Sequence, residues 1–334
     1  MMFPMMSPPP REHGFARAIF VTLATTIFSI SILANIYFFL IRGIFSTSGP
    51  TEITLREGGS DKVSIVPIHG VINDGMVAQV KEWIKKIEKD RDVKAIVLDV
   101  DSPGGTITAS DEIYHRFEEL KKSRNLTIVA SMGGVGASGA YYISCAADEI
   151  FAQRTTLTGS IGVVRPNYNF SELAQKWGVR DTSQTSPPNG YKQAGSPLRP
   201  ETERDKAYWQ ALIDQAYAQF VSIVKNARKG RLTGDETQLF DGRVFTAPDA
   251  QKSGLVDQIG YLDDATDWVS KHAGLSNPTV VKFQRRATWM DLLLSKADDA
   301  PPAARGNVNL NITIDSSLIH ELTTPRLEYL WTGQ

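Results

Sequence analysis

The chain has 334 residues, a formal net charge of -1 and 42% hydrophobic residues, a composition typical of a globular protein. The balanced charge argues against a nucleic-acid-binding protein, because such proteins carry a marked basic excess. The single cysteine, Cys145, excludes an intrachain disulfide, and its apolar surroundings predict a small core residue.

The N-terminal part of the chain contains a long uncharged segment. Residues 1–17 form a short tail rich in Met and Pro, and no charged residue occurs at 18–41. As a helix this segment would be about 36 Å long, enough to cross a hydrocarbon core of roughly 30 Å. A cleaved secretory signal is the alternative, but its apolar core runs only about 7–15 residues. We therefore expect a transmembrane anchor, and Arg11, Arg17 and Arg42 favour the bulk of the chain outside the cytoplasm.

The rest of the chain divides into a linker, a folded body and an extension. Residues 42–60 are predicted to be a linker, 61–285 the folded body and 286–334 a C-terminal extension. The body alternates predicted strands (63–68, 95–100, 126–130, 149–152) with predicted helices (78–89, 110–122, 138–146, 201–229). Repeated β–α units predict an α/β domain with a parallel sheet and helices on its faces. In the extension, an alternating run at 308–314 is compatible with an edge strand or a subunit contact.

Ser138 stands in a run of small residues, 133–140, that opens a predicted helix. The free N–H groups and dipole of a helix N-terminus favour negative charge beside such a hydroxyl. The same run would also suit close packing of a helix on a sheet. A serine nucleophile needs a base, and no histidine occurs between His115 and His272, which disfavours a Ser-His-Asp triad.

Two lysines are the remaining candidate bases between Ser138 and Pro200. Lys176 lies in a helical segment and is predicted to face solvent. Lys192 lies in an irregular segment, 182–200, of a length that is uncommon inside compact domains and often functional. A lysine can act as a base only where burial or a neighbouring cation keeps its amine neutral, whereas an ordinary loop lysine is solvated. The sequence therefore favours a Ser138–Lys192 pair.

Two further motifs could complete such a site. Gly104 and Gly105 follow a predicted strand, and glycine N–H groups at such a place can turn into a cleft and hold an oxyanion. Pro-Gly-Gly is also an ordinary turn. Ser160 could orient the lysine amine by a hydrogen bond, or it could be a simple turn serine.

Taken together, these segments resemble the bacterial signal peptide peptidase A family, whose members are membrane-anchored serine–lysine proteases. The resemblance rests on ordered motifs: Ser102-Pro103-Gly104-Gly105, 136–142 (GASGAYY), 146–150 (AADEI), 158–163 (TGSIGV), Gly190-Tyr191-Lys192, 242–246 (GRVFT) and 254–257 (GLVD). It implies a Clp/crotonase-like α/β domain of repeated ββα units, preceded by one N-terminal transmembrane helix.

The resemblance also implies a role for each site residue. Ser138 would be the nucleophile, Lys192 the general base and Ser160 the residue that orients the lysine. Gly104 or Gly105, with the Ser138 amide, would form the oxyanion hole. Two positions depart from the usual family pattern, Asp101 in place of Asn and Gln193 in place of Asp, which affects expectations about substrate preference.

The implied activity is degradation of remnant signal peptides or other apolar peptides at the cell membrane, by a catalytic domain outside the cytoplasm. No metal or cofactor is implied. Related short members are similar to ring-forming homo-oligomers, here expected to be octamers, in which neighbouring subunits complete each site. Ser138 and Lys192 of one chain can then stand well apart. The alternatives are an acyl-CoA enzyme of the crotonase type and an inactive membrane scaffold with the same fold.

Overall fold

The computed structural model describes residues 21–35, 37, 51–188, 190–284 and 327–331. The chain splits into two compact units. In the first, the described residues 21–35 form a helix with exposed apolar side chains. Within the described ranges, no helix is both long and apolar enough to span a bilayer. The expected anchor at 18–41 lies partly outside those ranges.

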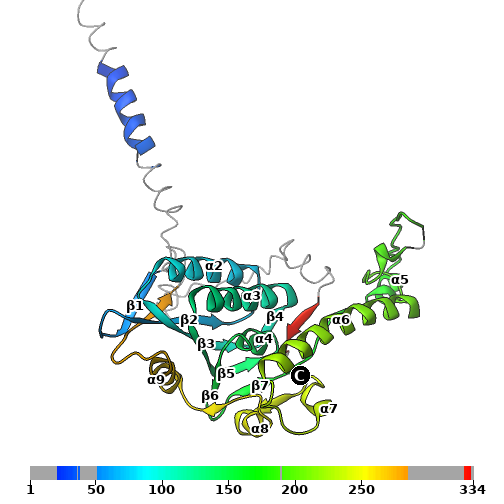
Figure 1. Cartoon of the computed structure of the whole chain (residues 1–334). Coiled ribbons are helices and arrows are strands. Elements are labelled where there is room, and N and C mark those ends of the chain that lie inside the picture. The colour runs from blue at the N-terminus through cyan, green and yellow to red at the C-terminus, as the bar shows by residue number, and fades with distance from the viewer. Residues whose placement is uncertain (1–20, 36, 38–50, 189, 285–326, 332–334) are drawn as a thin grey trace, which may run out of the picture. The chain divides into compact units, whose positions relative to one another are not determined.

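The second unit is built around a mixed nine-stranded sheet (Figure 1). Its path runs β1 (Thr51–Arg56), β10 (Thr279–Gln284), β2 (Lys62–His69), β3 (Val93–Ser102), β5 (Thr127–Ala137), β6 (Glu149–Ala152) and β9 (Gln258–Ile259). Off this path, β7 (Leu157–Gly159) pairs with β5 and with β8 (Val244–Thr246). A separate two-stranded sheet joins β4 (Gly104–Thr106) to β11 (Glu328–Leu330).

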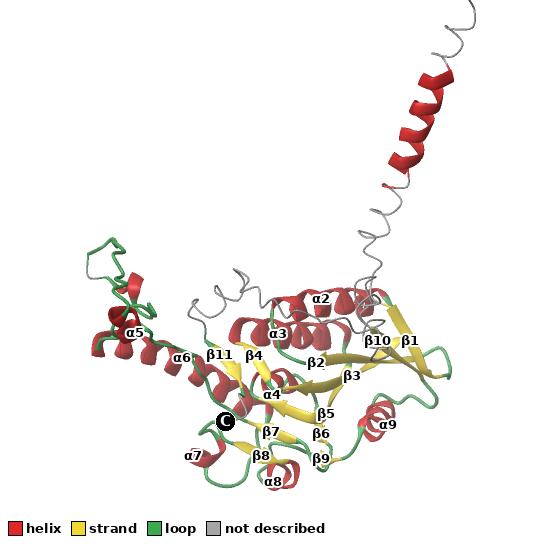
Figure 2. Cartoon of the chain, turned by 180° about the vertical axis from the view of Figure 1, so that it is seen from behind, coloured by secondary structure: helices red, strands yellow, loops and turns green. Residues whose placement is uncertain are grey.

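Helices cover both faces of the sheet, as Figures 1 and 2 show: α2 (Asp74–Lys89) and α3 (Ile107–Arg124) lie on one face and α9 (Leu262–His272) on the other. Strand β2 contributes apolar side chains to both helix layers. Val63 and Ile65 belong to the apolar cluster that includes buried residues of α9, whereas Val66 and Ile68 belong to the cluster that includes buried residues of α2 and α3. Such strands, buried on both faces, read as continuous apolar runs. The remaining helices are α4 (Gly139–Ser144), α5 (Ser171–Lys176), η1 (Tyr191–Gln193), α6 (Glu203–Ala227), α7 (Glu236–Leu239) and α8 (Ala247–Lys252).

The predicted strands and helices of the body are confirmed, with most ends shifted by a few residues, whereas β5 runs on to Ala137 beyond the predicted end at 130. The four predicted strands pair in parallel, as predicted, but the sheet is mixed, because β1 and β8 pair antiparallel with β10 and β7. Residues 51–56, expected to lie in a linker, form β1 on the sheet edge. The run at 308–314 lies outside the described residues. Cys145 is buried and Lys176 exposed, both as predicted.

A projection that we call the arm, the described residues among 165–209, extends from the sheet along the first turns of α6 (Figures 1 and 2). It carries α5 and η1. Tyr191 of η1 stacks on Tyr208 of α6 at 4.5 Å, and the Arg204 guanidinium lies 4.1 Å from the Tyr191 ring centre. The arm exposes large apolar side chains: Tyr168, Phe170, Leu173, Trp177 and Val179.

Candidate active site

Ser138 lies at the junction between β5 and α4, where the chain makes a sharp change of direction. Its φ of 56° is in the left-handed region, and the residue is 1% exposed. The Ser138 amide donates to the Gly159 carbonyl at 2.8 Å, and the Ser138 carbonyl accepts from Tyr142 to begin the helix. A non-glycine residue with positive φ carries strain that the surrounding contacts must hold in place. The Ser138 N–H, which the resemblance assigns to the oxyanion hole, is thus bonded to a carbonyl of its own chain.

A cavity of about 330 Å³ opens beside Ser138. Ser160 lines the same cavity, with a φ of 50° and its amide bonded to the Arg243 carbonyl at 2.8 Å. The other lining residues are Gly162, Val163, Val164, Gln210, Ile213, Asp214, Tyr217, Phe240, Asp241, Gly242 and Leu330. The structure therefore brings Ser138 and Ser160 together, although they come from different β–α connections.

Lys192 is not among the residues that line this cavity. It is exposed in η1, on the arm, where its neighbour Tyr191 packs on Tyr208. The described lining residues include no lysine, arginine or histidine. Within the described part of one copy, the wall of the cavity beside Ser138 therefore offers no nitrogen base.

Two carboxylates that the sequence did not single out also line the cavity. Asp214 accepts a hydrogen bond from Gln210 at 2.7 Å, one turn away on α6. Asp241 accepts from the Arg243 guanidinium at 2.8 Å, and these hydrogen bonds lower the pKa of the Asp241 carboxyl. It therefore stays ionised near neutral pH. No local pattern marks these residues, since only the packing of α6 on α4 and its hydrogen bond to the 240–242 turn bring them into the wall of this cavity.

The two predicted oxyanion glycines lie against the start of α4. Gly104 has a φ of 101°, and a Cβ atom there would collide with the Tyr329 carbonyl and approach the Gly139 amide nitrogen to 2.7 Å. A Cβ atom on Gly139 would lie 3.3 Å from the Gly105 nitrogen. The backbone amides of Gly105 and Gly139 therefore lie close to each other at the start of α4. Sequence reasoning missed Gly139, although its position directly after the serine was a usable signal.

The C-terminal strand β11 lies across these glycines. Its register places Tyr329 opposite Gly105 and Leu330 opposite Gly104. On its other side, Glu328 and Val164 exchange backbone hydrogen bonds of 2.9 and 3.0 Å. A segment from the C-terminal extension thus inserts between two parts of the site, and no sequence pattern predicted it.

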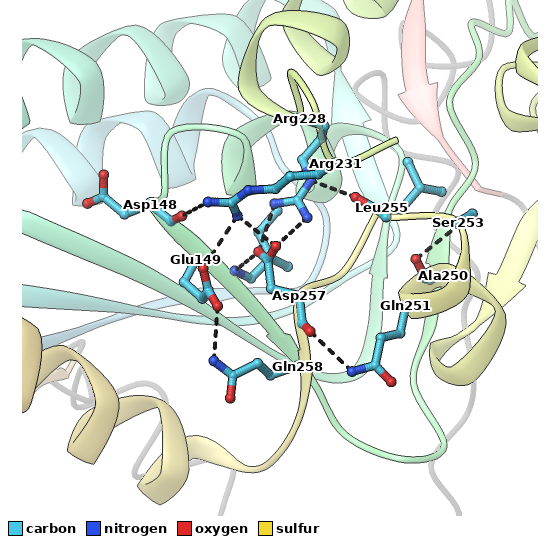
Figure 3. A network of polar contacts seen from close by, with 12 residues as sticks. Asp148, Glu149, Arg228, Arg231, Ala250, Gln251, Ser253, Leu255, Asp257 and Gln258 are labelled. Carbon is cyan, nitrogen blue, oxygen red and sulfur yellow. Dashed lines mark hydrogen bonds and ion pairs between the residues drawn. The ribbon is translucent and has the colours of Figure 1, made fainter. Parts of the chain in front are cut away.

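A buried ion pair lies where the end of α6 meets β6 (Figure 3). Arg228 is 2% exposed and donates to both Asp257 carboxylate oxygens, at 2.8 and 2.6 Å. Burial disfavours the charge of Arg228, but the hydrogen bonds and charge of Asp257 outweigh it and raise the pKa of the guanidinium. Asp257 also binds the Arg231 guanidinium and the Ile150 amide. This network fixes the end of α6 to β6 and explains the Asp of the 254–257 motif.

The fold and the matches to known proteins agree. The Clp protease family model matches residues 60–167, and with the layered mixed sheet it defines an α/β fold of the Clp type. The model of peptidase family S49 matches residues 120–276. The chain belongs to peptidase family S49 and is a protein of the signal peptide peptidase A type.

Individual relatives show the same likeness. The chain is 36% identical over 250 residues to a signal peptide peptidase SppA of Enterococcus faecium, covering 71% of this chain and 72% of that one. It is 37% identical over 215 residues to a protease of Synechocystis sp., covering 64% and 75%. It is 32% identical over 229 residues to protease 4 of Haemophilus influenzae, covering 66% and 36%. A solved membrane-bound stomatin-specific protease with a substrate peptide is 19% identical, with a TM-score of 0.43, covering 72% and 100%.

Proposed function

We propose that this serine peptidase uses Ser138 as its nucleophile and Lys192 of a neighbouring copy as the general base. The observation that carries the proposal is the cavity beside Ser138, which lacks a nitrogen base among its described lining residues. A serine needs such a base. The Lys192 side chain is exposed on the arm, where it is available to another copy.

Each step of the reaction can then be assigned to particular residues. Neutral Lys192, oriented by the Ser160 hydroxyl, takes the proton of the Ser138 hydroxyl, which attacks the peptide carbonyl. The amides near Gly104, Gly105 and Gly139 bind the oxyanion of the tetrahedral intermediate. The leaving amine takes the proton from the lysine, and an acyl-enzyme forms on Ser138. A water molecule deprotonated by the same lysine releases the product acid.

Assembly into a homo-oligomer would supply what the single chain lacks. The arm exposes aromatic side chains that soluble monomers rarely gather on one projection, Trp177 at 79% and Tyr168 at 59%. Contact with a second copy would bury them. The same contact would shield the Lys192 amine from water, as a neutral lysine requires. We infer a ring of subunits, an octamer, in which each arm reaches the next cavity.

Substrates are inferred from the cavity wall and from the N-terminal segment. Val163, Val164 and Ile213 supply an apolar part of a wall that also carries Asp214 and Asp241, and this apolar part suits remnant signal peptides and other apolar peptides. The uncharged segment 18–41 would anchor the chain in the membrane, with the catalytic unit outside the cytoplasm. Such an anchor places the cavity where apolar peptides accumulate.

Mixing two inactive variants tests the shared site. Ser138→Ala and Lys192→Ala should each abolish cleavage of an apolar peptide by the detergent-solubilised protein, with unchanged circular dichroism. Subunits are exchanged by mild dissociation and reassembly of equal amounts of the two variants. About a quarter of the wild-type activity should return, because random neighbours then pair an intact serine with an intact lysine. Full activity of either single variant would refute the proposal, and a mixture without recovery would refute sharing between copies.

Acyl-CoA turnover measured in the same preparation distinguishes the proposed peptidase from the alternative, an acyl-CoA enzyme of the crotonase type. A peptidase of this kind should show none. Lys176→Ala is the matched control for Lys192→Ala, because both lysines are exposed and lie on the arm. It should leave peptide cleavage unchanged.

A further inference from the structure

We propose that the Asp214 carboxylate binds the protonated amine of Lys192 from the neighbouring copy, and that this ion pair sets the pH above which the peptidase becomes active. The proposal rests on the proposed function, because that function brings the lysine of one copy into the cavity of the next. It gives Asp214 a positioning role, outside the covalent steps, that can be measured in the pH profile.

Asp214 shares a cavity with the two serines of the proposed reaction. Ser138, Ser160 and Asp214 all line the same space of about 330 Å³. In the proposed reaction, the incoming amine must approach both hydroxyls. The amine therefore enters a space whose wall also carries this carboxylate.

The helix α6 holds Asp214 in that wall. Its carboxylate accepts a hydrogen bond of 2.7 Å from Gln210, one turn earlier on the same helix. The Tyr217 hydroxyl, one turn later in the other direction along α6, donates to the Phe240 carbonyl at 2.6 Å. These bonds fix both the side chain and the helix that carries it.

The charge of Asp214 lacks a cationic partner within the described wall. Its hydrogen bond comes from a neutral amide, and the described lining residues include no lysine, arginine or histidine. The second carboxylate, Asp241, differs because Arg243 forms an ion pair with it at 2.6 Å. Tyr217 is the other titratable group of the wall, and burial raises the pKa of its phenol, so it stays neutral near neutral pH.

Other charged groups lie beside the wall without lining it. Arg165 follows the wall residue Val164 and forms an ion pair with Glu201 at 3.2 Å. Glu328 is buried in the strand β11, where its backbone pairs with Val164. Asp214 is therefore the carboxylate that the described wall offers to an arriving cation.

Two effects then act in opposite directions on the amine in the assembled site. Burial under the next arm favours the neutral amine, by up to 3–5 pH units for a fully covered group, whereas a carboxylate about 4–6 Å away favours the protonated amine by about 1–3 units. As the pH rises, the amine releases its proton to solvent. The neutral amine can then accept the proton of the Ser138 hydroxyl.

The pH profile of kcat/KM for an apolar peptide tests the pair in the full-length, detergent-solubilised protein. Asp214→Asn should lower the midpoint of the rise by about one pH unit, so that the rate below both midpoints increases about tenfold. The rate on the alkaline plateau should stay within about twofold. Asp214→Glu keeps the charge and should restore the wild-type midpoint. Asp263→Asn is the matched control, because it removes an exposed carboxylate from α9, which packs in the other apolar cluster.

Mixed oligomers show which copy supplies the carboxylate. One variant keeps Ser138 and carries Lys192→Ala, and the other keeps Lys192 and carries Ser138→Ala. Each active site of the mixture then contains the serine of the first variant and the lysine of the second. Asp214→Asn should lower the midpoint when it is placed in the serine-bearing copy and leave it unchanged when it is placed in the lysine-bearing copy.

The outcomes separate this proposal from the proposed function. A midpoint that Asp214→Asn leaves unchanged, or a shift that follows the lysine-bearing copy, would overturn the ion pair even if the mixture is active. The same shift in Asp214→Glu would also overturn it, because it would show a structural effect of the substitution and not an effect of charge. A mixture that recovers no activity would instead refute the sharing of the site between copies.

Discussion

Ser138 and Ser160 both have left-handed backbone angles, with φ of 56° and 50°, and line the same cavity. Among the described residues, the other non-glycine residue with positive φ is Asn125, a residue type that adopts this conformation readily. Strain of this kind persists only where surrounding contacts hold it, and it is common at functional sites. The pairing of the two serines therefore supports a shared role in the proposed reaction.

Replacement of Ser160 separates its hydroxyl from its backbone. Ser160→Gly removes the hydroxyl and relieves the strained φ, so we expect kcat to fall about 10- to 100-fold while the free energy of unfolding rises by about 1 kcal/mol. Ser160→Ala should lower kcat equally without the gain in stability. Steady-state kinetics and urea unfolding measure the two effects. An unchanged kcat in both variants would remove Ser160 from the mechanism.

Gly104 and Gly70 offer a matched pair of glycines with positive φ. Gly104→Ala adds a Cβ atom that collides with the Tyr329 carbonyl, so we expect loss of activity and displacement of β11. Gly70→Ala has open space around its Cβ atom, and we expect only the backbone cost, about 1–2 kcal/mol of unfolding free energy, with activity retained. Peptide cleavage and thermal unfolding compare them. Equal effects would show that the surroundings of Gly104 do not matter.

The Arg228–Asp257 pair should make a large contribution to stability where the end of α6 meets β6. Asp257→Asn leaves a buried guanidinium without its charge partner, and we expect a loss of about 3–5 kcal/mol in the free energy of unfolding. The control is Lys252→Met, which breaks the exposed pair with Asp249 and should change it by less than about 1 kcal/mol. Chemical denaturation of both variants makes the comparison. A small effect of Asp257→Asn would mean that water or neighbouring groups compensate the charge.

Cys145 should be chemically silent in the folded protein. Burial raises the pKa of its thiol to about 12, and the side chain lies in the main apolar core. We expect no reaction with a thiol reagent at pH 8 until the protein is unfolded in guanidinium, when one thiol per chain reacts. Because this is the single cysteine of the sequence, the count is unambiguous. Rapid labelling of the native protein would contradict the predicted core position.

Asp99 should contribute to stability above about pH 4 and lose that contribution in acid. Burial would raise its pKa, but hydrogen bonds from His69 and Lys282 outweigh burial and lower it below the unfolded value of about 3.9. A lowered folded pKa stabilises the protein above the unfolded pKa, and the effect disappears as pH falls through the folded value. The difference in unfolding free energy between wild type and Asp99→Asn should therefore shrink as pH falls from about 4 through the folded pKa of Asp99. A constant difference across this range would be inconsistent with the lowered pKa.

Local sequence determined much of the fold and one half of the site. The apolar runs that become β3 and β5, and the helical stripe of α2, contain enough buried side chains to specify their own conformation. Ser138 was recognisable because small residues around a helix start are a local signal. Peptidase family membership followed from several such signals in a compatible order.

Only the tertiary structure decided what depends on distant partners. The edge strand β1 is polar enough to read as a linker until β10 pairs with it. Tyr329 comes from the far end of the sequence to pair with Gly105, and Asp241 reaches the cavity through a turn that no periodicity marks. The physical reason is that hydrogen bonds between strands and the burial of a side chain require a partner surface, and a one-dimensional pattern records only one side of each contact.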